Sequence, residues 1–81
     1  MDASPPVSLA ALEPGRAARV VRVAVADAER LAAEGLNPGD RVEVEVRLPL
    51  GGPVVVRIGR ARIAIARAVA AGILVEVERA A

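Results

Sequence analysis

The sequence contains no histidine, lysine, cysteine or tyrosine, the residues that most often carry acid–base or nucleophilic chemistry near neutral pH. Only carboxylates remain for proton transfer. The side-chain hydroxyl groups are those of Ser4 and Ser8, which stand in a proline-flanked N-terminal segment with no histidine or lysine to activate them. The composition therefore predicts a protein that is not an enzyme, with no catalytic residue and no cofactor.

The absence of cysteine and histidine also bears on metal binding, because tetrahedral zinc sites and soft-metal sites need these ligands. An all-carboxylate site for a hard cation would have to come from acidic residues that folding brings together. The acidic residues available for this are Asp27, Glu29, Asp40, Glu43 and Glu45. Helix capping and alternating charges on outer strand faces explain them more simply, and we expect no metal site.

Long apolar runs are missing as well, and none approaches the ~18 residues that span a bilayer. The N-terminus lacks the apolar segment that follows a charged segment in secretory signals. Without cysteine, no disulfide can form, and a domain of 81 residues must be held together by its core alone. These features predict one soluble cytoplasmic domain with no direct membrane insertion.

Charge is nearly balanced, since eleven arginines face ten acidic residues and the formal net charge is +1. The arginines Arg57, Arg60, Arg62 and Arg67 lie in a stretch with no acidic residue. They are either solvated residues on outer strand faces or a basic face for an acidic partner. Nucleic-acid binding is disfavoured because aromatic side chains, on which single-stranded bases stack, are absent.

Alternation of apolar and charged residues predicts short β-strands. The clearest runs from Arg41 to Leu48, where Val42, Val44, Val46 and Leu48 share the apolar face and Arg47 shares the charged one. Four further strands are expected at residues 17–25, 54–58, 62–65 and 73–78, the first with a bulge at Val20-Val21. Residues 1–7 are expected to form a disordered tail before a domain of residues 8–81.

Short helices and turns separate these strands. Ser8 is expected to cap a helical turn that Pro14-Gly15 ends, and Asp27 to cap a helix over residues 28–34. Gly35 suits the left-handed position of a Schellman ending, with Leu36 returning to contact Leu31. Asn37-Pro38-Gly39-Asp40 predicts a type II turn. The whole pattern predicts an all-β fold with short helices, a small β-barrel of five to six strands.

Six segments stand in a characteristic order and cover nearly all of residues 8–77: LAALEPG at residues 9–15, RLAAEGLNPG at 30–39, VEV at 42–44, PLGGP at 49–53, IAI at 63–65 and ILV at 73–75. Their order and spacing resemble the ferrous iron transport protein A (FeoA) family. One departure is that Ala66 stands where the family often has arginine, with Arg67 one position later.

The resemblance implies an SH3-like barrel and an accessory role in bacterial ferrous iron uptake. It further implies that the protein binds the cytosolic GTPase region of the membrane transporter FeoB and modulates it by protein–protein contacts. Similar domains occur in metal-dependent repressors, so a regulatory domain of that kind is an alternative. Two further alternatives are a small nucleic-acid-binding barrel and a homo-oligomer that assembles through an open barrel edge or an apolar patch.

Two surfaces are candidates for partner binding beside the four arginines. The loop of Leu50, Gly51, Gly52 and Pro53 either docks a partner or is only a connection that needs unusual backbone dihedrals. It lacks the lysine and the long following helix of a phosphate-binding loop, so we expect no GTP binding by this chain. Val55 and Leu74 are expected on outer strand faces, where they form an apolar contact patch or are isolated surface residues.

Overall fold

The computed structural model describes residues 5–79, which form one six-stranded antiparallel sheet with three short helices. The strands are β1 (Val7–Ser8), β2 (Ala17–Val23), β3 (Arg41–Arg47), β4 (Val54–Ile58), β5 (Ala61–Ile65) and β6 (Ile73–Val77). The helices are the 3₁₀ turn η1 (Leu9–Ala11), α1 (Val25–Ala33) and α2 (Arg67–Ala71). The predicted all-β class with short helices is confirmed.

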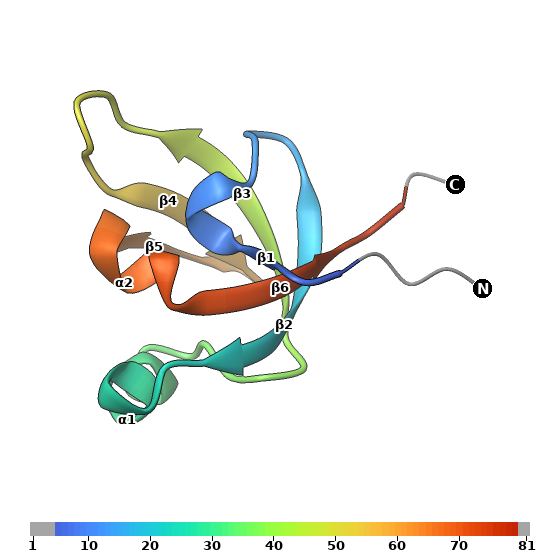
Figure 1. The fold of residues 1–81 in the computed structure, drawn as a ribbon, viewed down its shortest axis with the longest axis vertical. Coiled ribbons are helices and arrows are strands. Elements are labelled where there is room, and N and C mark those ends of the chain that lie inside the picture. The colour runs from blue at the N-terminus through green and yellow to red at the C-terminus, as the bar shows by residue number, and fades with distance from the viewer. Residues whose placement is uncertain (1–4, 80–81) are drawn as a thin grey trace.

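The strands follow the order β1-β6-β2-β3-β4-β5, so the last strand of the chain lies between the first two. Helix α1 lies at one end of the molecule, and the loop between β3 and β4 projects at the opposite end, beside α2 (Figure 1). The turn η1 packs on the same side as α2, to which it is joined by the hydrogen bond that the Ser8 hydroxyl donates to the Ala70 carbonyl. The sheet therefore presents one loop-rich end.

The core is entirely aliphatic. Its buried side chains are Leu9, Leu12, Ala18, Val20, Leu31, Leu36, Val42, Val44, Val54, Val56, Ile65, Ala70, Ile73 and Val75. They come from every element except the two-residue strand β1, and among the described residues no polar or charged residue is buried with them. Each buried CH₂ group contributes ~0.8 kcal/mol of hydrophobic free energy, so small residues such as valine and alanine contribute less each than larger ones. The stability of this core therefore depends on close packing.

Two bulges bend the sheet, and only the first follows the sequence prediction. In β2 the register shifts between Val20 and Arg22, as predicted at Val20-Val21. In β3 it shifts between Val44 and Val46, so that Val46 pairs with the outward-facing Val55. The prediction of an uninterrupted alternation is therefore wrong beyond Val44. Val46 and Leu48 are 41% and 40% exposed rather than in the core.

Helix α1 ends as predicted but begins earlier. Its first residue is Val25 and its N-cap is Ala24, which makes no side-chain capping bond. The prediction of Asp27 as the cap is wrong, and this residue instead lies in the first turn and pairs with Arg30 at 2.7 Å. The Schellman ending is confirmed, because Gly35 has φ +94° and the Leu36 N–H donates to the Leu31 carbonyl at 2.9 Å.

The structure also shows the outcome of the predictions for the Ser8 cap, the type II turn and the N-terminal tail. The Ser8 hydroxyl accepts a hydrogen bond from the Ala10 N–H, which confirms the cap of η1. The type II turn is confirmed by Gly39 at φ +95° and by the Asp40 N–H, which donates to the Asn37 carbonyl at 3.1 Å. Of the tail expected over residues 1–7, residues 1–4 lie outside the described residues, while Val7 pairs with Val75 in the sheet.

Candidate functional site

The loop between β3 and β4 is closed by its own backbone. The Leu48 N–H donates to the Pro53 carbonyl at 3.0 Å, and the Gly52 N–H donates to the Pro49 carbonyl at 3.1 Å. At the tip, Leu50 and Gly51 both have positive φ, +60° and +71°. The tight turn therefore holds the Leu50 side chain in solvent, where it is fully exposed.

Arg67, the first residue of α2, fastens this loop to the body of the domain. Its Nε–H donates to the Gly52 carbonyl at 3.1 Å, and one of its Nη atoms donates to the Leu48 carbonyl at 3.0 Å. A planar guanidinium can bind two carbonyls in fixed directions at once. Arg67 therefore links the loop to α2, and it is a half-buried positioning residue rather than part of a freely exposed basic face.

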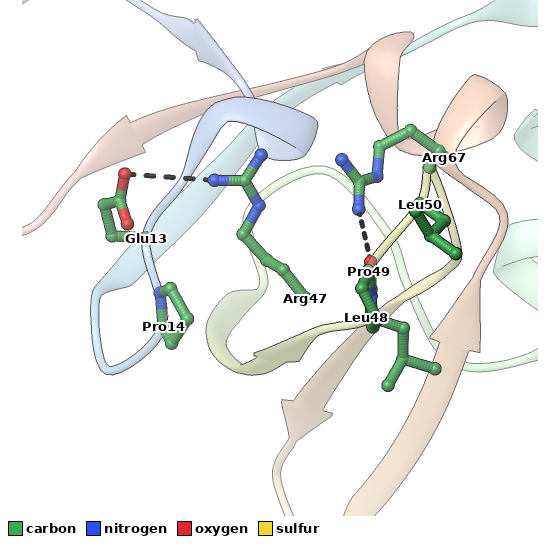
Figure 2. Close-up of a pocket in the computed structure, with 8 residues that line it drawn as sticks. Glu13, Pro14, Arg47, Leu48, Pro49, Leu50 and Arg67 are labelled. Carbon is green, nitrogen blue, oxygen red and sulfur yellow. Dashed lines mark hydrogen bonds and ion pairs between the residues drawn. The ribbon is translucent and has the colours of Figure 1, made fainter.

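Beside the loop lies a surface hollow of about 360 Å³ lined by Glu13, Pro14, Arg47, Leu48, Pro49, Leu50, Gly51 and Arg67 (Figure 2). The β3 bulge places Arg47 opposite Val54, a buried residue, and turns its side chain toward this hollow. Its guanidinium lies between Glu13 and Arg67 in Figure 2, with 3.8 Å between its Nη1 and the nearer Glu13 oxygen. Segments distant in sequence therefore meet at this end.

Sequence reasoning missed five residues of the hollow as site residues: Glu13, Pro14, Arg47, Leu48 and Pro49. Arg47 was expected on the charged outer face with Arg41, Glu43 and Glu45, and that expectation is wrong because the bulge reverses its side. The strict alternation through Leu48 contains no signal for the bulge. Glu13 and Pro14 could only have been placed by knowing that the Gly15 N–H donates to the Val44 carbonyl, which brings their turn beside β3.

The other predicted arginines lie elsewhere and are mostly paired. Arg57 on β4 and Arg62 on β5 both bind Glu45, at 2.7 and 2.8 Å, across the outer face of three strands. Arg60 is exposed at the turn between β4 and β5. The structure therefore does not gather Arg57, Arg60, Arg62 and Arg67 into one unpaired basic surface.

Val55 and Leu74 lie on separate parts of the sheet. Val55 on β4 has Val46 and Ala64 as its cross-strand partners, which makes a short apolar row across the outer face of β3, β4 and β5. Leu74 on β6 faces Ser8 and Arg22. Strands β2 and β3 separate the two residues in the sheet, so they do not form a single row.

The acidic residues are dispersed. In the part of the chain that the structure describes, no three of them come close enough to hold a metal ion. Asp27 and Glu45 are used in ion pairs, and a carboxylate oxygen of Asp40 accepts a hydrogen bond from the Asn37 N–H at 2.8 Å. Over residues 5–79 no helix is long and apolar enough to cross a membrane.

The strand order, the short helices and the projecting loop define a small SH3-like β-barrel domain. A family model described as the FeoA domain matches residues 7–77, and the chain therefore belongs to the FeoA domain family. The match includes every strand and helix of the structure. The predicted fold and the predicted family are both confirmed.

Solved structures of this family superpose over most of the chain. A crystal structure of an iron uptake regulatory protein (FeoA) has a TM-score of 0.82 and 28% identity, covering 93% of this chain and all of that one. FeoA of Stenotrophomonas maltophilia complexed with zinc, described as a prokaryotic SH3 domain protein, has a TM-score of 0.72 and 28% identity, covering 86% of this chain and 89% of that one.

A manganese-dependent transcriptional repressor shares the fold, with a TM-score of 0.81 and 24% identity. The similarity covers 96% of this chain but 45% of the repressor, so the domain is one part of a larger protein there. No curated protein sequence matches the chain significantly. The names of the related proteins connect the family with iron transport. They suggest an accessory role in that process, as the resemblance implied.

Proposed function

We propose that this protein is a non-catalytic cytoplasmic accessory protein of bacterial ferrous iron uptake that binds the cytosolic GTPase region of the transporter FeoB. Membership of the FeoA domain family supports the uptake system. The absence of histidine, lysine and cysteine supports action by contact rather than by chemistry. By binding one state of the GTPase region more tightly than another, such a domain shifts the population of that state.

The observation that carries the proposal is the loop between β3 and β4. It presents a fully exposed leucine on a turn that Arg67 holds in place. A loop whose backbone is already held loses little backbone entropy when a partner covers it, and its exposed leucine contributes apolar burial to the complex. We therefore place the contact with the transporter at Leu50, Gly51, Gly52 and Pro53.

The test is co-purification of this protein with the soluble cytosolic region of FeoB, together with GTP hydrolysis measured with and without it. Leu50→Ala should weaken association about tenfold, the usual effect of losing a central apolar anchor. Val25→Ala is the matched control, because Val25 is 93% exposed on α1 at the other end of the molecule and should leave binding unchanged. No association and no change in hydrolysis would contradict the proposal.

The alternative of a nucleic-acid-binding barrel is weaker, because Glu45 pairs with two of the four arginines that it requires. It predicts a complex that weakens steeply with salt, since phosphate contacts release counterions. A gel shift at ~50 mM salt tests it. For a repressor-type regulatory domain, the support is the shared fold alone.

A further inference from the structure

The hollow beside the β3–β4 loop contains two guanidinium groups, those of Arg47 and Arg67 (Figure 2). Each guanidinium carries five N–H donors. Arg67 uses two of them on the Gly52 and Leu48 carbonyls, which fixes its plane. Its remaining donors and those of Arg47 are available to an acceptor that enters the hollow.

Arg47 is the less satisfied of the two. Its Nε is buried and has no hydrogen-bond partner among the described residues. Its contact with Glu13 is 3.8 Å long, beyond hydrogen-bond distance, and the Glu13 side chain is 74% exposed. Buried donors in folded proteins are almost always bonded, so the described contacts leave the Arg47 guanidinium under-bonded, with its Nη1 facing Glu13 at the hollow.

The other ion pairs of this domain are short, which makes Arg47 different. Arg57 and Arg62 hold Glu45 at 2.7 and 2.8 Å. Arg41, which lines a second hollow, holds Glu78 at 2.8 Å. An anion that binds Arg41 in that second hollow would compete with Glu78, whereas one that binds Arg47 only lengthens a contact that is already 3.8 Å long.

Charge selects the kind of acceptor. Two arginines and one glutamate line the hollow, which leaves a net charge of +1. One carboxylate neutralises this charge and can bind a guanidinium through two parallel hydrogen bonds. A phosphate dianion would leave an excess of negative charge next to Glu13. The apolar lining of Pro14, Leu48 and Leu50 suits an aliphatic neighbour of that carboxylate.

We propose that this hollow is a receptor for the side-chain carboxylate of a protein partner, held by Arg47 and Arg67, with an adjacent apolar residue of the partner covering Leu50. The inference deepens the proposed function and rests on it, since it takes the transporter's cytosolic region as that partner. It adds a specificity element to the loop contact: an aspartate or glutamate next to an aliphatic residue on the partner's surface.

The first test does not need the transporter. The capped dipeptides acetyl-Glu-Leu-amide and acetyl-Leu-Glu-amide are titrated into the ¹⁵N-labelled protein, and the Nε–H resonances of the arginines and the backbone amides of the loop are followed. A single such contact corresponds to a Kd on the order of 1–10 mM. The resonances of Arg47, Arg67 and Leu50 should shift, and acetyl-Gln-Leu-amide should leave them in place.

Arg47→Gln should abolish these shifts while keeping the amide spectrum of the folded core. The matched control is Arg60→Gln, which removes the same charge from an exposed turn outside the hollow and should bind the dipeptides like the wild type. If neither glutamyl dipeptide shifts the Arg47 resonance, the inference is overturned. It is also overturned if inorganic phosphate binds there as tightly, because the hollow is then a general anion site.

The second test separates this inference from the proposed function. The soluble cytosolic region of FeoB is mixed with wild type, Arg47→Gln and Arg60→Gln, and the Kd is measured by calorimetry. Arg47→Gln should weaken binding tenfold or more, because it removes one partner of a charge pair that is buried in the complex. If the wild type and Arg47→Gln bind equally, the carboxylate receptor is wrong and the function stands. If the wild type does not bind, the proposed function itself fails.

Discussion

Leu50 contributes no apolar burial to the isolated domain and has an unfavourable backbone conformation. It is fully exposed, and its φ of +60° lies in the left-handed region that leucine rarely adopts. With Gly51 at +71° beside it, the turn has the two positive φ angles of a type I′ turn, where asparagine or glycine is the preferred first residue. Non-glycine residues in such conformations are characteristic of binding and switch regions.

Leu50→Asn should therefore stabilise the free protein by about 0.5–1 kcal/mol, because asparagine adopts the left-handed conformation at lower cost. Urea unfolding of the two proteins measures the difference. Leu48→Asn is the control: Leu48 has no positive φ and is more than half buried, so the same change there should destabilise. A less stable Leu50→Asn would contradict the argument that the leucine is held in strain.

At the scale of elements, the bulge in β3 decides where the site forms. It turns Val46 outward and Arg47 toward the hollow, although the sequence alternates without a break from Arg41 to Leu48. In β2 the adjacent apolar pair Val20-Val21 interrupts the alternation and signalled the bulge, whereas β3 alternates without interruption and its bulge depends on which residues of β4 lie opposite. The strands were predictable from their own residues, whereas the hollow was not.

Helix α1 shows the same distinction within one element. Its end was predictable because Gly35 and Leu36 form the Schellman motif from local residues alone. Its start was not, because Ala24 occupies the cap position with no side-chain bond, and its N–H instead donates to the Gly72 carbonyl at 3.1 Å. A tertiary contact with the segment before β6 thus accompanies the N-cap of the helix at Ala24, three residues before the cap predicted at Asp27.

Arg67→Met tests how much the Arg67 side chain contributes to the stability of the β3–β4 loop. The substitution keeps an aliphatic stem but leaves the Gly52 and Leu48 carbonyls without their shared donor. Loss of two charge-assisted hydrogen bonds at a partly exposed site should cost about 1–2 kcal/mol. Hydrogen exchange should quicken at the amides of Leu48 and Gly52 more than in β2.

The counterpart for that measurement is Arg60→Met, an exposed arginine outside this contact, which should leave loop exchange unchanged. Equal protection of the loop in Arg67→Met and wild type would mean that the Pro49 and Pro53 carbonyls hold the loop without help.

Glu45 links three strands, because its two oxygens bind Arg57 on β4 and Arg62 on β5. Glu45→Gln should destabilise by no more than about 1 kcal/mol, since both arginines are more than half exposed and exposed ion pairs contribute little. It should also raise non-specific binding of an oligonucleotide at low salt by freeing two positive charges. A gel shift of the variant against wild type at ~50 mM salt measures this.

Glu76→Gln is the control for the Glu45 variant, since it makes the same charge change on β6, away from these arginines. Its oligonucleotide binding should stay at the wild-type level. If Glu45→Gln binds no more oligonucleotide than Glu76→Gln, the pairing is not what keeps this face from attracting phosphate.

At the scale of the whole molecule, the core shows why the fold was accessible to sequence reasoning. Every buried side chain is aliphatic, and most stand at alternating positions of short strands. Because no polar or charged residue among residues 5–79 is buried, no polar side chain in the core interrupts this alternation. The strand order, in which β6 lies between β1 and β2, was not predicted, because alternation does not specify which strands are neighbours.

The same composition predicts how the stability of the molecule depends on pH. No side chain of the sequence has an ordinary pKa between 5 and 8, since histidine and cysteine are absent. The hydrogen bond and the charge of Glu78 raise the pKa of Arg41 above its already high ordinary value. A raised pKa stabilises the fold below the unfolded-state pKa, and that contribution is lost only as pH rises through the folded-state value, in strongly alkaline solution.

The free energy of unfolding in urea should therefore change by less than about 0.5 kcal/mol between pH 6 and pH 9 at constant ionic strength. Ile58→His, at a half-buried position of β4, is the comparison variant and should lose stability below its own pKa, because burial disfavours the charged imidazole. A change above about 1 kcal/mol in the wild type would mean that a group other than those considered takes up or releases a proton on unfolding.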